Sequence, residues 1–197
     1  MCAAVILGIG AALLWQHSAP PIELTTGSFL SPRRTLPDFS LIDQKGRTFA
    51  TADLRGHWSL LFFGYTNCPD FCPTTLTTLA AMEKNLRSAK AAVIPQVIFV
   101  SVDAKRDTPA QLAKYVPYFD PSFVGLTAAD QPSIDAVAKE LGVAVIIRPA
   151  SDGNYTVDHS GEIFVLSPDG QIAAILTGPF SADALRGDFL RIVAARA

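Results

Sequence analysis

The feature that most constrains this chain is an almost unbroken apolar run, WSLLFFGY, from Trp58 to Tyr65. The run has the length of one strand, and both its odd and its even positions carry apolar side chains. Such a strand is buried on both faces, as in the centre of an α/β sheet covered by helices. A helix is predicted to begin near Pro73, because proline suits the first helical position and Leu76 and Leu79 begin a helical repeat.

The rest of the chain alternates between strand and helix patterns. Strands are predicted at residues 39–43, 47–49, 97–102, 143–147, 163–166 and 171–176, and further helices at Thr108–Pro109, at Asp130 or Ser133, and at Ser181. The last two strands flank a Pro-Asp-Gly turn and form a predicted hairpin. This order predicts an α/β domain with a thioredoxin-like fold, in which helices flank a mixed central sheet.

Composition favours one globular domain and argues against a nucleic-acid partner. The chain has 197 residues, of which 49% are hydrophobic and 17% charged. Lysine and arginine number 16 and aspartate and glutamate 18, for a net charge of -2. The basic residues are scattered, whereas nucleic-acid binding requires a clustered basic surface.

The N-terminus is predicted to lie outside the folded domain. Residues 1–15 carry no charge, and their length falls between a signal-peptide core of roughly 7–15 residues and a membrane helix of about 20. No small-x-small cleavage site follows, and Pro20–Pro21 separates the segment from the rest. We predict a retained membrane anchor at 1–18, whose natural start could lie upstream of Met1, a linker at 19–34 and a domain at 35–197. A cleaved signal is the alternative.

A retained anchor predicts that the domain lies on the extracytoplasmic side of a membrane. The bacterial periplasm is the favoured location, and the mitochondrial intermembrane space is the second. In either compartment a close thiol pair becomes oxidised unless something reduces it or metallates it.

Cys68 and Cys72 lie four residues apart, between the apolar strand and its helix. A helix N-terminus offers free backbone N–H groups and a partial positive charge, which stabilise a thiolate. Thiolates attack disulfides and bind metals, so the pair is predicted to be redox-active, metal-binding or both. An inert local disulfide is the structural alternative, although closing so short a loop would stabilise the fold little.

His159 is the histidine with a candidate role, because His17 and His57 have no context that suggests chemistry. In a thioredoxin-like fold the loop with His159 would pass near the N-terminus of the cysteine-bearing helix. Two thiolates and one imidazole suit Cu(I) in trigonal coordination and, with an added ligand, Cu(II). Structural zinc would need a fourth protein ligand. Asp158 could orient the imidazole or be a plain turn residue.

Several segments together resemble the Sco/SenC family of cytochrome c oxidase assembly proteins, from about Leu36 to the C-terminus. They are GYT at 64–66, CPDFCP at 68–73, VSVD at 100–103, RDTP at 106–109 and VDHS at 157–160. The resemblance implies a thioredoxin fold and one copper ion bound through Cys68, Cys72 and His159. Ala104 departs from the family, which usually has proline there, but no ligand is affected.

The resemblance also implies a function and partners. The protein would be a copper metallochaperone that assists assembly of the binuclear copper centre of cytochrome c oxidase subunit II, by delivering copper, by reducing the cysteines of that centre, or by both. A thioredoxin-like reductant and a copper donor protein are further candidate partners. Asp103 matches an acidic position near the family's site, so we expect it to support the ligands or to contact the partner.

The main alternative is a thiol-disulfide reductase that uses Cys68 and Cys72 as a redox pair on an extracytoplasmic target. Thioredoxin-like reductases carry a cis-proline just before the strand predicted at 163–166, and residues 159–162 contain none. A peroxiredoxin is disfavoured, because Leu61 and Tyr65 stand where its active site needs proline and threonine or serine. A purely structural module would leave the cysteines and the histidine unexplained.

Overall fold

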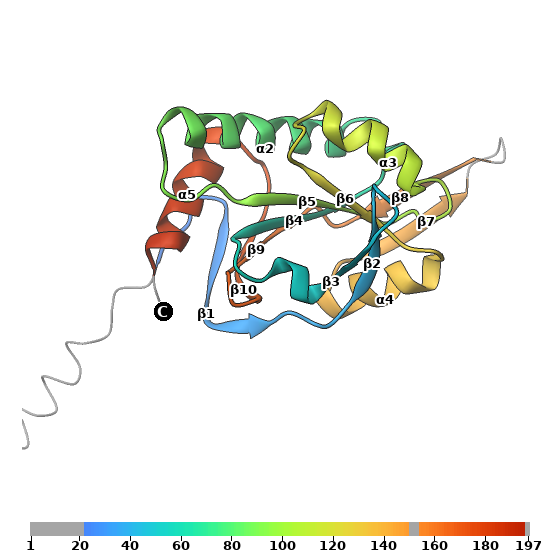
Figure 1. The fold of residues 1–197 in the computed structure, drawn as a ribbon, viewed down its shortest axis with the longest axis horizontal. Coiled ribbons are helices and arrows are strands. Elements are labelled where there is room, and N and C mark those ends of the chain that lie inside the picture. The colour runs from blue at the N-terminus through green and yellow to red at the C-terminus, as the bar shows by residue number, and fades with distance from the viewer. Residues whose placement is uncertain (1–21, 150–153, 196–197) are drawn as a thin grey trace, which may run out of the picture.

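The computed structural model describes residues 22–149 and 154–195 (Figure 1). With η for 3-10 helices, its elements are β1 (Gly27–Thr35), β2 (Ser40–Asp43), β3 (Thr48–Ala50), η1 (Thr51–Leu54), β4 (Ser59–Gly64), α2 (Phe71–Ser88), β5 (Gln96–Ser101), α3 (Pro109–Tyr115), η2 (Val116–Tyr118), β6 (Val124–Thr127), α4 (Gln131–Leu141), β7 (Val145–Pro149), β8 (Tyr155–His159), β9 (Ile163–Leu166), β10 (Gln171–Leu176) and α5 (Ala182–Ala194). The membrane anchor predicted at 1–18 lies outside the described residues. Within them, no helix combines the length and apolarity that crossing a bilayer requires.

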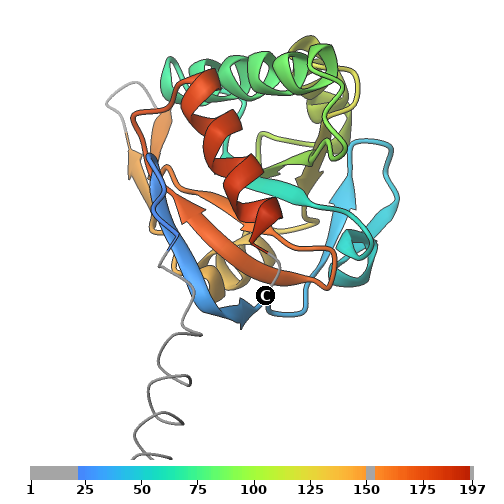
Figure 2. The same cartoon turned by 90° about the vertical axis from the view of Figure 1, so that its left-hand side faces the viewer.

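Eight strands form one mixed sheet in the order β1-β10-β9-β4-β5-β6-β2-β3. Strands β4, β5 and β6 are parallel, and the remaining pairings are antiparallel. Helices α2 and α3 lie on one side of the sheet and α4 on the other (Figure 1), while α5 packs against α2 (Figure 2). The prediction of an α/β domain with a mixed central sheet flanked by helices is confirmed.

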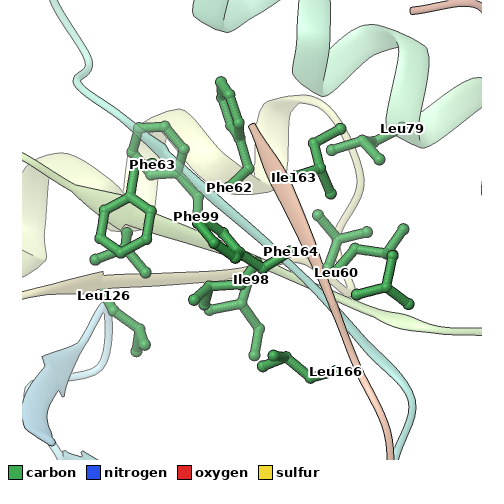
Figure 3. Packing of buried hydrophobic residues seen from close by; sticks show 14 of the residues in the cluster. Leu60, Phe62, Phe63, Leu79, Ile98, Phe99, Leu126, Ile163, Phe164 and Leu166 are labelled. Carbon is green, nitrogen blue, oxygen red and sulfur yellow. The ribbon is translucent and has the colours of Figure 1, made fainter. Parts of the chain in front are cut away.

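The apolar run predicted to be a central strand is β4, and all six of its residues are buried. It pairs in parallel with β5 and antiparallel with β9. Figure 3 shows Phe62 and Phe63 of this strand among the side chains of β5, β9 and α2. Because the strand is held on both edges and covered on both faces, its C-terminal end is a rigid platform for the cysteines that follow.

The prediction of a linker at 19–34 is wrong for its second half, because residues 27–35 form β1 and pair with β10. The segment contains Pro32 and two arginines, which are unusual in a central strand. An edge strand tolerates both, since one side of its backbone needs no partner. The pairing is irregular between Phe29 and Arg34, next to that proline.

Local signals at helix ends predicted several boundaries well. Thr108 caps α3 and accepts a hydrogen bond from the Gln111 N–H, and Ser181 caps α5 in the same manner. Helix α4 begins after Asp130 and ends at Leu141, and it is capped by Gly142, whose φ of 80° is the left-handed conformation that glycine adopts most easily.

A two-stranded ribbon lies apart from the main sheet and consists of β7 and β8. Residues 155–159 were predicted as a loop, but they form β8 and bring His159 to the end of a strand. Most of β7 is exposed, whereas β8 turns Tyr155, Val157 and His159 towards the domain. The ribbon is therefore held to the domain mainly by alternate side chains of one strand.

Candidate metal centre

Cys68 lies in the loop after β4, and Cys72 lies in the first turn of α2. The helix begins at Phe71, two residues before the predicted start, so Cys72 belongs to the helix and its side chain is fully buried. The Cys72 backbone N–H points at the Cys68 sulfur across 3.4 Å. A free N–H of the first helical turn thus faces the more accessible thiol, as predicted from the position of the pair.

His159 joins the two cysteines from a position 87 residues beyond Cys72. Its Nε2 lies 3.3 Å from the Cys72 sulfur, and the three potential ligand atoms all lie within 4.8 Å of one another. The other ring nitrogen, Nδ1, lies 2.9 Å from the Ser160 carbonyl oxygen. Metal binding would require the proton on Nδ1, where the ring donates to that carbonyl and leaves the Nε2 lone pair for an ion.

The two thiols differ in charge and exposure. The hydrogen bond from the Cys72 thiol to the Cys68 sulfur lowers the pKa of Cys68 to about 4; burial opposes this shift, and the His159 ring and the Cys72 N–H reinforce it. The pKa of Cys72 is raised by the same sharing of a proton and by its burial. Near neutral pH the metal-free pair therefore carries one thiolate, on the half-exposed Cys68, and one thiol, on the buried Cys72.

Aromatic rings surround the imidazole. The ring centroids of Phe62, Tyr65 and Phe71 lie 6.0 to 6.2 Å from that of His159, in edge-on arrangements. Phe71, which lies between the cysteines in the sequence, is 43% exposed and forms the outer edge of the site. A shallow recess opens there and includes Cys68, Phe71 and His159 in its lining. The site is therefore lined by aromatic rings on its inner side and is accessible on its outer side.

Asp158 does not orient the histidine in this arrangement. Successive residues of a strand point to opposite faces, and the Asp158 carboxylate binds Arg148 across the ribbon. The Ser160 carbonyl oxygen makes the contact with Nδ1 that was considered for Asp158. Asp103 is 2% exposed, and its carboxylate binds Arg106 and the Tyr155 hydroxyl.

The sequence assigned no role to Asp107, whose carboxylate anchors the cysteine loop through hydrogen bonds. Its carboxylate accepts hydrogen bonds from the Thr66 N–H at 2.9 Å, from the Thr66 hydroxyl at 2.6 Å and from the Ser101 hydroxyl at 2.6 Å. A possible signal was present, because Asp107 belongs to the RDTP segment on which the resemblance partly rested. Its contact with Thr66, 41 residues earlier, is a property of the fold alone.

The donor set fits a soft metal ion. Bonds of about 2.0–2.3 Å to nitrogen and sulfur in a trigonal plane would separate the ligand atoms by about 3.5–4 Å. The described atoms lie within 4.8 Å of one another without an ion. Small side-chain adjustments would therefore suffice to close the three donors around one ion, and thiolate with imidazole is a set that copper accepts.

The fold and this donor set define a thioredoxin-like domain with a candidate soft-metal site at the N-terminus of its first long helix. Residues 30–194 match the model of the SCO1/SenC family. The chain therefore belongs to the SCO1/SenC family, and the predicted resemblance is confirmed.

Individual relatives agree with this assignment. The mitochondrial SCO2 homolog of Bos taurus is 39% identical over 80% of this chain and 59% of its own length. The crystal structure of Arabidopsis thaliana ScoI with copper bound has 32% identity and a TM-score of 0.77, covering 81% of this chain and 98% of that one. The structure of Bradyrhizobium japonicum ScoI with copper bound has 34% identity and a TM-score of 0.71, covering 80% and 99%.

Proposed function

We propose that this protein is a copper metallochaperone that binds one copper ion through Cys68, Cys72 and His159. The observation that carries the proposal is the convergence of two sulfurs and one imidazole nitrogen within 4.8 Å in a member of the SCO1/SenC family. The copper bound in two solved relatives supports copper as the cargo. A three-donor soft site suits Cu(I), and an added ligand on the accessible side would accommodate Cu(II).

Each donor has a distinct part in uptake and release. Cys68 is half-exposed and ionised, so it is the donor that meets incoming copper first. Cys72 loses its proton on binding the metal, and His159 contributes Nε2 while the Ser160 carbonyl fixes the ring. Release follows by ligand exchange, in which cysteines or histidines of a docked acceptor replace these donors one at a time.

We propose the copper centre of cytochrome c oxidase subunit II as the acceptor, on the strength of the family assignment. Delivery to a membrane-bound acceptor accords with an anchored domain outside the cytoplasm, in the bacterial periplasm or the mitochondrial intermembrane space. Strand β1 begins beside α5, on the opposite side of the molecule from the β7–β8 ribbon (Figure 1). A tether on that side would leave the metal centre free to face a partner.

The contrast between the two thiols supports a second role, as a thiol-disulfide reductase for an extracytoplasmic target. An ionised, accessible Cys68 beside a buried, protonated Cys72 is the arrangement of an attacking and a resolving thiol. Reduction of a target disulfide would leave Cys68 and Cys72 joined as a disulfide. Two electrons and two protons from a dithiol of a thioredoxin-like reductant would restore them, and that dithiol would become the disulfide.

Copper stoichiometry of the reduced full chain tests the proposal. We expect one copper ion per wild-type chain, and binding lost or greatly weakened in Cys68→Ser, Cys72→Ser and His159→Ala. The matched control is His57→Ala, which removes an exposed histidine in the turn before β4 and should bind like wild type. Absence of tight copper in the wild type would reject the metallochaperone and leave the reductase. Equal losses in His57→Ala and His159→Ala would remove His159 from the site.

A further inference from the structure

One short segment, residues 103–107, contacts both elements that carry the candidate ligands. It leaves the C-terminal end of β5 beside the end of β4 and is tightened by hydrogen bonds from the Arg106 and Asp107 N–H groups to the Asp103 carbonyl oxygen, at 3.2 and 2.9 Å. Side chains of this segment contact both the ribbon that ends in His159 and the loop that leads to Cys68.

The ribbon contact is a clamp on Tyr155. Arg106 Nη1 donates to the Tyr155 carbonyl oxygen at 3.0 Å, and the guanidinium carbon lies 3.7 Å from the centre of the Tyr155 ring. The Tyr155 hydroxyl donates to Asp103 Oδ1 at 2.8 Å, and Arg106 Nε donates to Oδ2 of the same carboxylate. The residue is thus held by its backbone, its ring face and its hydroxyl at once.

The contacts with Tyr155 lie where they can fix the position of His159. Tyr155 and His159 lie on the same face of β8, four residues apart, so the strand transmits a fixed distance between them. The ribbon is not paired with the main sheet, and most of β7 is exposed. Arg106 also lies 5.6 Å from the centre of the Tyr65 ring, whose own centre is 6.0 Å from that of His159.

The second contact secures the cysteine loop. Asp107 accepts two hydrogen bonds from Thr66, which lies two residues before Cys68, and a third from the Ser101 hydroxyl at the end of β5. Asp107 is fully buried, so these bonds are shielded from competing water. The same segment therefore fixes the loop relative to β5 and the ribbon relative to the loop.

We propose that residues 103–107 set the spacing between the histidine and the cysteines, with Arg106 as the positioning residue for His159 through Tyr155 and Asp107 as the positioning residue for the cysteine loop. The inference rests on the proposed function only in using copper as one of its probes. The inference divides the site into two parts, the histidine and the cysteine loop, which different substitutions can disturb separately. A general structural role would instead weaken everything together.

The experiment compares Arg106→Leu and Tyr155→Phe with Arg148→Leu in the full chain. Arg148 is the matched control, because it is an exposed arginine on the same ribbon that binds Asp158 rather than the domain. Three quantities are measured: copper affinity, the reduction potential of the Cys68–Cys72 pair, and the NMR signals of the His159 ring in the reduced, metal-free protein. The copper measurement is repeated with each substitution in a His159→Ala background.

We expect Arg106→Leu to weaken copper binding by about 10- to 100-fold, as for other residues that support a ligand, and Tyr155→Phe to weaken it by a smaller factor. Both should broaden or shift the His159 ring signals without metal and change the reduction potential less than Asp107→Asn does. In the His159→Ala background neither should lower copper affinity further. Asp107→Asn should instead shift the reduction potential, because it loosens the cysteine loop.

Several results would overturn the inference. Equal loss of affinity with and without His159 would show that Arg106 does not act through the histidine. Unchanged His159 ring signals in Arg106→Leu, or effects matched by Arg148→Leu, would do the same. If Arg106→Leu does not fold, Tyr155→Phe, which removes a single oxygen, decides the question. Absence of copper binding in the wild type would reject the proposed function, while the ring signals would still test the clamp.

Discussion

Gly64→Ala tests whether the packing beneath the cysteines controls the site. Gly64 ends β4, and a Cβ there would lie 2.6 Å from Phe99 Cε2 and 3.0 Å from the Cys72 sulfur. Ordinary contacts between carbon atoms are about 3.5–4.0 Å, so the ring would have to move by about 1 Å. Both neighbours are fully buried, so they cannot move outwards into solvent. Overpacking of this kind costs about 1–3 kcal/mol of the free energy of unfolding.

The assay is urea-induced unfolding of the metal-free protein, followed by copper titration of the folded variant. We expect a loss of stability in the range above and copper binding about tenfold weaker, because the Cys72 sulfur is displaced. Gly187→Ala is the matched control. Its Cβ would meet only Arg191 Nη1 at 3.8 Å, and replacing a helical glycine should stabilise the protein by about 0.5–1 kcal/mol. If Gly64→Ala proved as stable as Gly187→Ala and bound copper like wild type, the packing argument would be refuted.

Three further predictions concern side chains whose pKa values are shifted in the folded protein. Because the pKa of Cys68 is lowered to about 4 and that of Cys72 is raised, iodoacetamide at pH 6 should label the metal-free protein first at Cys68, which mass spectrometry of peptides can locate. Burial raises the pKa of Glu83 to about 7 despite the nearby Arg87, so the folded state binds this proton more tightly than the unfolded chain does. As pH rises from about 4.5 to 7, the wild type should therefore lose up to about 3 kcal/mol of stability relative to Glu83→Gln. Denaturant unfolding at each pH measures this loss. Burial favours a higher pKa for Asp188, but hydrogen bonds from Thr25, Thr26 and Arg191 outweigh it and hold the pKa below its usual range. Asp188→Asn should therefore cost about 2–4 kcal/mol of unfolding free energy at pH 7. The difference from wild type should shrink as pH falls below about 4.

Each of these has an outcome that contradicts it. Equal labelling of both thiols at pH 6 would mean that the pair does not share a proton as described. A constant stability difference between wild type and Glu83→Gln across that pH range would mean that the carboxyl titrates normally. Asp188→Asn as stable as wild type at neutral pH would mean that the bonds from the Thr25–Thr26 segment to α5 contribute little.

Local patterns in the sequence determined much of the fold. The run that forms β4 was predictable because apolar residues occupy both of its faces. Helix ends were marked by Thr108, Asp130 and Gly142, because caps and left-handed glycines have local chemical requirements. The position of the cysteines before a helix indicated stabilised thiolates for the same reason. These features depend on residues that are neighbours in the chain, so periodicity and spacing reveal them.

Tertiary structure decided the features that join distant segments. An edge strand such as β1 carries proline and charge like a linker, so only its pairing with β10 distinguishes it. His159 meets Cys72 across 87 residues, and the face of β8 that it occupies turns Asp158 away towards Arg148. The hold of Arg106 on Tyr155 likewise spans 49 residues. Spacing along the chain does not encode these contacts, because they arise only when the packed core brings separate elements to one end of the sheet.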